Sequence, residues 1–162
     1  MTKPWLAGLV VLVCSGSALT EEGPLKVGVI LPLSGNTSNY GTEALRGINI
    51  AVDSINSKGG VKGRLIALDV RDNAGDPNKT SQAAAGLIES NVLAIIGPIT
   101  STNAAAAAVC QQHKTPLVLP TATSPYCTEI GEYICRICFT DPFQSEALAQ
   151  YTREHLRSER VA

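Results

Sequence analysis

Residues 93–103 read LAIIGPITSTN, and this stretch decides the fold that we predict. Its apolar beginning predicts a short buried strand, and the alanines that follow, 104–108, predict a helix. Three hydroxyl side chains, Thr100, Ser101 and Thr102, fall between the two. A helix N-terminus carries unpaired backbone N–H groups and about half a positive charge, so hydroxyls there suit a carboxylate. The stretch therefore predicts an anion-binding loop, or else an ordinary helix cap.

A second strand that ends in hydroxyl residues supports the binding interpretation. Residues 116–120 read PLVLP, and TATS follows at 121–124. Because the carboxyl ends of parallel strands meet at one edge of a sheet, we expect these two loops to lie side by side.

The whole chain alternates short apolar runs with segments of helical period, which is typical of a parallel sheet with crossover helices. We predict strands at 26–31, 65–70, near 93, near 117 and at 133–139. We predict helices at 41–57, 78–90, from 104 to about 113, and 142–157. One face of the first helix should carry Leu45, Ile48, Ala51, Val52 and Ile55. The fold class is therefore α/β, with helices on both faces of a parallel sheet.

Composition limits the partners of this chain. Its 162 residues suffice for one domain, and 44% hydrophobic residues permit a sizeable core. The formal charge of −1 leaves no basic surface to neutralise phosphates, so we expect no nucleic-acid partner.

The N-terminal residues have the pattern of an export signal. Lys3 precedes an apolar run from Trp5 to Cys14, and small residues follow at 15–18. This run of roughly ten residues is half of the about twenty needed to span a bilayer. We predict a signal peptide at 1–18, a mature N-terminal segment at 19–25, and a periplasmic or secreted protein. The alternative is a lipoprotein that is acylated on Cys14.

Four cysteines remain after this processing: Cys110, Cys127, Cys135 and Cys138. An export route permits disulfides, so they are interpreted as structural disulfides of unknown pairing or as free thiols. Cys135 and Cys138 form a C-x-x-C, but they fall in a predicted strand, whereas redox pairs of this kind lie at a helix N-terminus. A zinc site would need two further ligands, and His113 and His155 do not have the spacing of a zinc-binding pair.

Other motifs have structural explanations. The glycines at 59–63 follow a helix, so they mark its end and a turn and do not form a dinucleotide loop. Asp72 and Asp76 are interpreted as turn and capping residues. We therefore predict no metal and no cofactor.

An ordered series of motifs resembles the type I periplasmic binding proteins, in particular those for leucine, isoleucine and valine. The motifs are KVGVILPLSG at 26–35, the Tyr40-Gly41 step, INSKGGVKG at 55–63, DNAGDP at 72–77, IGP at 96–98, TATSP at 121–125 and the segment 136–143. The resemblance covers about residues 25–162. It implies a Rossmann-like lobe, and we assign 26–162 to the N-terminal ligand-binding lobe.

The resemblance also implies binding residues. They are Tyr40, Ser101, Thr102, Thr121, Ala122 and Thr123. Ser101 and Thr123 would bind a ligand carboxylate through hydroxyl and backbone N–H, and the Thr121 carbonyl would accept from the ligand ammonium. Tyr40 would lie against the ligand. The implied function is capture of an amino acid for delivery to an ABC transporter permease, without catalysis.

The chain departs from the family pattern in two ways. Gly75 and Thr100 stand where some members have a disulfide, and no second lobe follows residue 162, although that lobe is needed for closure around the ligand. The alternatives are a receptor ectodomain that senses a ligand with the same fold, and a redox protein that uses Cys135 and Cys138.

Overall fold

The computed structural model describes residues 23–101, 105–158 and 160. The predicted signal peptide, Cys14, residues 19–22 and Thr102 lie outside this range. Within it, no helix combines the length and the apolar character that crossing a membrane requires.

In the part of the chain that the structure describes, five strands form one sheet in which every neighbouring pair is parallel. They are β1 (Leu25–Leu31), β2 (Ile66–Asp72), β3 (Ala94–Ile96), β4 (Leu117–Leu119) and β5 (Ile134–Arg136). The strand order is β2-β1-β3-β4-β5, with β1 paired to β2 along its whole length. The predicted parallel sheet is confirmed.

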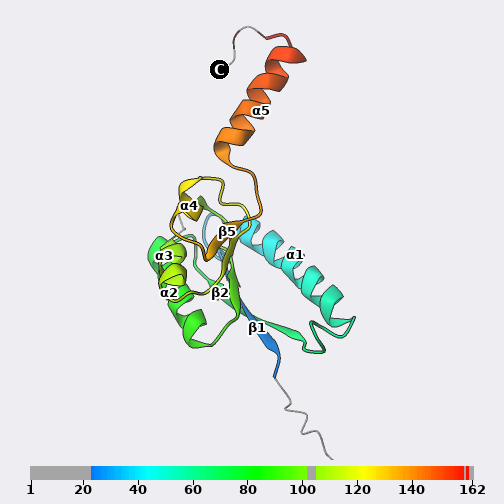
Figure 1. Ribbon diagram of the computed structural model, residues 1–162, viewed down its shortest axis with the longest axis vertical. Helices are drawn as coiled ribbons and strands as arrows, with labels where there is room; N and C mark the ends of the chain where they lie inside the picture. The colour runs from blue at the N-terminus through cyan, green and yellow to red at the C-terminus, as the bar shows by residue number, and fades with distance from the viewer. Residues whose placement is uncertain (1–22, 102–104, 159, 161–162) are drawn as a thin grey trace, which may run out of the picture.

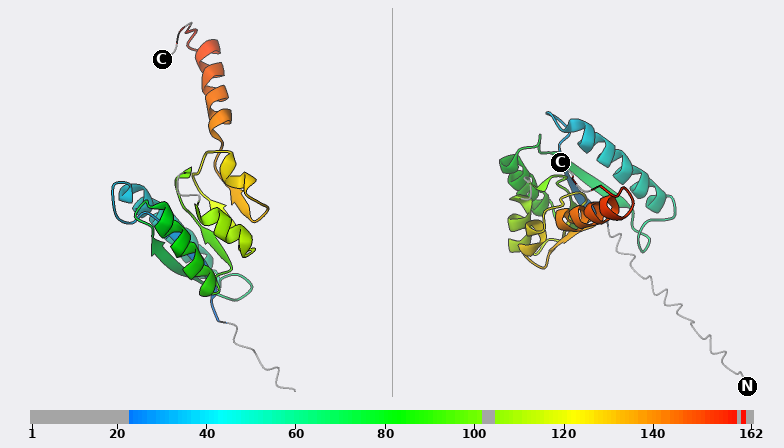
Figure 2. Two further views of the ribbon diagram at one scale, coloured as in Figure 1. Left: turned by 90° about the vertical axis from the view of Figure 1, so that its left-hand side faces the viewer. Right: turned by 90° about the horizontal axis from the view of Figure 1, so that it is seen from above.

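Helices cover both faces of this sheet. They are α1 (Ser38–Asn56), α2 (Pro77–Glu89), α3 (Ala105–Gln112), α4 (Tyr126–Glu129) and α5 (Asp141–Glu154). α1 lies on one face, and α2 and α3 lie side by side on the other (Figures 1 and 2). The three-layer αβα architecture is therefore confirmed. α4 was not predicted, because four residues are too few to show a helical period.

Two helix ends follow the predicted local chemistry. The side chain of Asp76 caps α2 by accepting the Lys79 N–H at 2.9 Å, and Pro77 begins the helix. α1 ends before Gly59 and Gly60, which have φ values of 92° and 75°. The glycines therefore mark a helix end, as expected.

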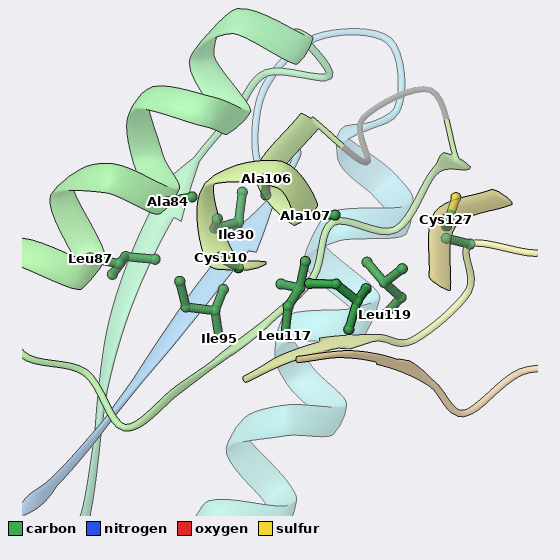
Figure 3. Close-up of a cluster of buried hydrophobic side chains, with 12 residues drawn as sticks. Ile30, Ala84, Leu87, Ile95, Ala106, Ala107, Cys110, Leu117, Leu119 and Cys127 are labelled. Carbon is green, nitrogen blue, oxygen red and sulfur yellow. The ribbon is translucent and has the colours of Figure 1, made fainter. Parts of the chain in front are cut away.

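The main core lies between the sheet and the helices α2 and α3 (Figure 3). Leu87 of α2 belongs to the same cluster as Ile30, Ile95 and Leu117 of the strands, and all four side chains are fully buried. Burial of each such side chain contributes about 1.5–3 kcal/mol, so this layer supplies much of the stability of the sheet.

The opposite face, under α1, is covered less completely. Leu45, Ile48 and Val52 of the predicted stripe are half-buried, whereas Ala51 and Ile55 are exposed. Gly41 is the buried residue of this helix.

The last helix stands apart from the sheet. α5 has no buried residue and extends away from the other elements (Figure 1 and the left view of Figure 2). The tightly packed part of the lobe therefore ends with β5. The assignment of residues 26–162 to the lobe stays a prediction.

Candidate functional site

The loops after β3 and β4 lie side by side, as the parallel direction of the two strands predicted. The Thr121 hydroxyl donates to the Ile99 carbonyl at 2.5 Å. The Ser124 N–H donates to the Ser101 Oγ at 3.2 Å. Two hydrogen bonds thus join the hydroxyl-rich loops beyond the carboxyl ends of the strands, where open parallel sheets bind ligands.

Two glycines allow the chain to approach this edge closely. Gly97 has a φ of 108°, and a Cβ there would overlap the Ile30 carbonyl oxygen. A Cβ on Gly41 would overlap the carbonyl oxygen of Pro32. The absence of a side chain at Gly41 therefore lets α1 begin against the end of β1, with Tyr40 beside the loops.

A cavity of about 400 Å³ opens between the start of α1 and these loops. It is lined by Thr37, Tyr40, Ala44, Ile99, Thr100 and Thr121. The Tyr40 side chain stays 65% exposed, so its ring is available to a solute. The surface that the lining exposes is predominantly apolar, and it therefore suits the apolar part of a solute.

Ser101 lies on a neighbouring hollow. This hollow, of about 350 Å³, is lined by Ser101, Ala105, Ala108, Ser124, Tyr126, Cys127 and Ile130. The Ser101 hydroxyl accepts from Ser124 and still has a proton to donate. The structure thus brings Tyr40 and Thr121 to one cavity. It places Ser101 on the neighbouring hollow, and the hydrogen bonds between the two loops connect these sites.

Thr123 and Ala122 differ in how accessible they are. Thr123 is half-buried, and its side-chain hydroxyl has no hydrogen-bond partner among the described residues. Ala122 is fully buried in the core cluster. Its side chain therefore serves packing, and its assignment as a binding residue stays a prediction.

Arg136 is a residue of this site that the sequence did not identify. Its guanidinium donates to the carbonyl oxygens of Ser124 at 2.7 Å and Ala122 at 3.3 Å, and to the Thr128 hydroxyl at 3.0 Å. The available signal was an arginine within the otherwise apolar run YICRICF at 133–139. A cation in such a strand needs oxygen partners, but the sequence does not say which.

Asp72 connects two other loops at the same edge. Its Oδ1 accepts the backbone N–H groups of Leu33 at 2.8 Å, Ser34 at 3.3 Å and Ala74 at 2.8 Å. Desolvation raises the pKa of this carboxyl, but hydrogen bonds from Ser34, Ala74 and Leu33 outweigh it, and the pKa falls below the ordinary value. Asp72 therefore acts as the predicted turn residue, in its charged form.

The four described cysteines are free thiols. Burial raises the pKa of the Cys110 thiol to about 11. Cys135 lies exposed on β5 and donates to the Leu117 carbonyl at 3.6 Å, and Cys138 follows the strand. Neither belongs to a helix N-terminus that would stabilise a thiolate. No group of three or more His, Cys, Asp or Glu gathers as metal ligands in the part of the chain that the structure describes.

The family model described as "Periplasmic binding protein" matches residues 24–162. The chain belongs to this family. The match confirms the family that the motifs resemble. The three-layer αβα architecture around a parallel sheet fits one lobe of a periplasmic binding protein.

Similar periplasmic binding proteins include amino-acid binders. A Leu/Ile/Val-binding protein, BraC3 of Rhizobium johnstonii, is 34% identical over 140 residues, which are 85% of this chain and 38% of that protein. The branched-chain amino acid transporter substrate binding protein LivJ from Streptococcus pneumoniae, solved with isoleucine, has a TM-score of 0.78 and 33% identity, covering 83% of this chain and 39% of that one. A leucine binding protein, LivK from Thermotoga maritima, has a TM-score of 0.76 and 35% identity, with coverage of 84% and 39%. The chain thus spans about two fifths of the length of its relatives.

Proposed function

We propose that this chain is the N-terminal part of an exported solute-binding protein that captures an amino acid, branched-chain or similar, and delivers it to an ABC transporter. The observation that carries the proposal is the joining of two hydroxyl-rich loops beside an apolar cavity that Tyr40 lines. The similarity to amino-acid-binding relatives supports the same solute class.

In this proposal the polar end of the solute lies on the loops. The Ser101 hydroxyl donates its remaining proton to the solute carboxylate, and Thr123 adds its hydroxyl and backbone N–H. The Thr121 carbonyl accepts from the ammonium group. Hydrogen bonds to a charged group contribute about 1.5–3 kcal/mol each, so two hydroxyls account for a substantial part of the affinity.

The apolar part of the solute lies in the Tyr40 cavity. Ala44 and Ile99 supply aliphatic contact, and the exposed Tyr40 ring supplies an aromatic face. The proposed activity is binding without chemical conversion, because hydroxyls, amides and a carbonyl hold a charged solute without a reaction.

A second lobe is part of this proposal. Phe143, Leu148 and Tyr151 of α5 are 54–63% exposed, and Phe143, Ala147 and Tyr151 follow one another at the four-residue spacing of a single helix face. We infer that this face packs against a second lobe, whose closure over the cavity completes the binding site. Export through the signal at 1–18 and release to the permease belong to the same proposal.

Isothermal titration calorimetry of the full-length natural protein tests this function. Leucine, isoleucine and valine are titrated in turn, with lysine and glutamate as charged controls. We expect one-to-one binding of at least one apolar amino acid, and a weaker or absent signal for the charged ones. If none of the apolar amino acids binds, the proposed solute class is wrong.

A further inference from the structure

The backbone on both sides of Thr123 is held by one side chain. Arg136, the last residue of β5, is half-buried and extends its guanidinium to the loop after β4. Nη1 donates to the carbonyls of Ala122 and Ser124, the residues directly before and after Thr123. Nη2 donates to the Thr128 hydroxyl on α4, the short helix that follows this loop.

This arrangement adds to the contacts that hold the loop, which also include the Thr121–Ile99 and Ser124–Ser101 hydrogen bonds. The rigid guanidinium fork makes hydrogen bonds in fixed directions, so it sets the orientation of both neighbouring carbonyls at once. The Thr123 carbonyl is held separately, by the Asp141 N–H at 3.1 Å. The Thr123 hydroxyl is left without a partner among the described residues, and it is therefore available to a solute.

The charge of Arg136 is not cancelled locally. Its recorded partners are carbonyl and hydroxyl oxygens, and no carboxylate of the described residues pairs with it. A half-buried cation is screened less than an exposed one, so its field favours an anion bound at Thr123.

We infer that Arg136 is the positioning residue of the carboxylate-binding loop: it fixes the conformation of residues 122–124 and adds positive charge behind the bound carboxylate. The inference rests on the proposed function, because it assigns Arg136 a role at that same site. It also predicts that the solute is recognised by its negative charge.

Two variants separate these contributions. Arg136→Lys keeps the charge and loses the fork, whereas Arg136→Gln loses the charge. Lys58→Gln, in the exposed turn after α1, is the matched control for loss of a cation. Each full-length protein is titrated with leucine and with leucinamide, which lacks the carboxylate.

We expect Arg136→Gln to weaken leucine binding by about tenfold or more and leucinamide binding by less than about threefold. Arg136→Lys should recover part of the leucine affinity, and Lys58→Gln should change neither ligand. Equal losses for the two ligands, or an unchanged leucine affinity, would overturn the inference.

Hydrogen exchange without ligand tests the positioning role independently of solute binding. We expect the amides of residues 121–128 to exchange faster in Arg136→Gln, while those of β1 keep their protection. Unchanged exchange at 121–128 would overturn the positioning role. If the unmodified protein bound no amino acid, the proposed function would fail, and the exchange result would still decide whether Arg136 holds the loop.

Discussion

The backbone N–H of Ser124 donates to the hydroxyl oxygen of Ser101 at 3.2 Å, and so fixes the loop after β4 against the loop after β3. The contact uses a lone pair of Ser101 and leaves the hydroxyl proton for a solute. The two loops are thus ordered before binding, which lowers the entropy cost that a solute has to overcome.

Removing the hydroxyl of either residue that is proposed to bind the solute carboxylate should weaken binding. We expect Ser101→Ala and Thr123→Ala each to cost about 1–3 kcal/mol of binding free energy, because each removes a hydrogen bond to a charged group. Calorimetric titration of the full-length protein with its best amino acid measures the effect. Ser54→Ala, exposed on α1, serves as the control. Unchanged affinity in both loop variants would show that the carboxylate binds elsewhere.

Two glycines of α1 should respond to alanine in opposite ways. Gly41→Ala places a Cβ against the Pro32 carbonyl oxygen, so we expect a loss of about 1–3 kcal/mol in the free energy of unfolding. Nothing lies within 4 Å of a Cβ at Gly47, and Gly47→Ala should stabilise by up to about 1 kcal/mol through helix propensity. Urea denaturation compares the two. Equal effects of the same sign would mean that α1 does not begin against β1 as described.

The carboxylate of Asp72 should contribute pH-dependent stability. Its pKa is lower in the folded state, so its contribution is complete above the unfolded pKa of about 3.9 and is lost as the pH falls through the folded value. Asp72→Asn should therefore lower the urea midpoint at neutral pH, and the gap to the unmodified protein should narrow toward about pH 3. A gap that stayed constant with pH would contradict a stabilising role of the charge.

The thiols should differ in reactivity. Cys110 is buried with a pKa of about 11, so at mildly alkaline pH it should resist iodoacetamide, whereas the exposed Cys135 should be alkylated. Mass spectrometry of peptides from native and denatured protein locates the label. Labelling of Cys110 as fast as Cys135 in the native protein would mean that the core beneath α3 opens readily.

Local sequence patterns predicted the sheet well, because both the strands and the helix starts have clear local signals. Apolar runs such as 93–96 are too short and too continuous for surface helices, and Asp76-Pro77 marks a helix start. The joining of the loops followed from strand direction alone, since parallel neighbours end at one edge.

Predictions that depended on tertiary packing were weaker. Ala122 lies between hydroxyl residues in the sequence, yet it is fully buried in the core cluster. The role of Arg136 depends on carbonyl groups 12 and 14 positions earlier in the chain, which no periodicity reveals. The position of α5, apart from the sheet, could not be predicted from the sequence either, because a helical pattern does not specify what covers its apolar face.

We propose above all that Ser101 and Thr123 bind the carboxylate of an amino acid. The most direct measurement is calorimetric titration of the full-length natural protein with leucine, isoleucine and valine and with the corresponding amides. We expect one-to-one binding of at least one of these acids, and binding of its amide weaker by about tenfold or more. Equal affinity for acid and amide would contradict it.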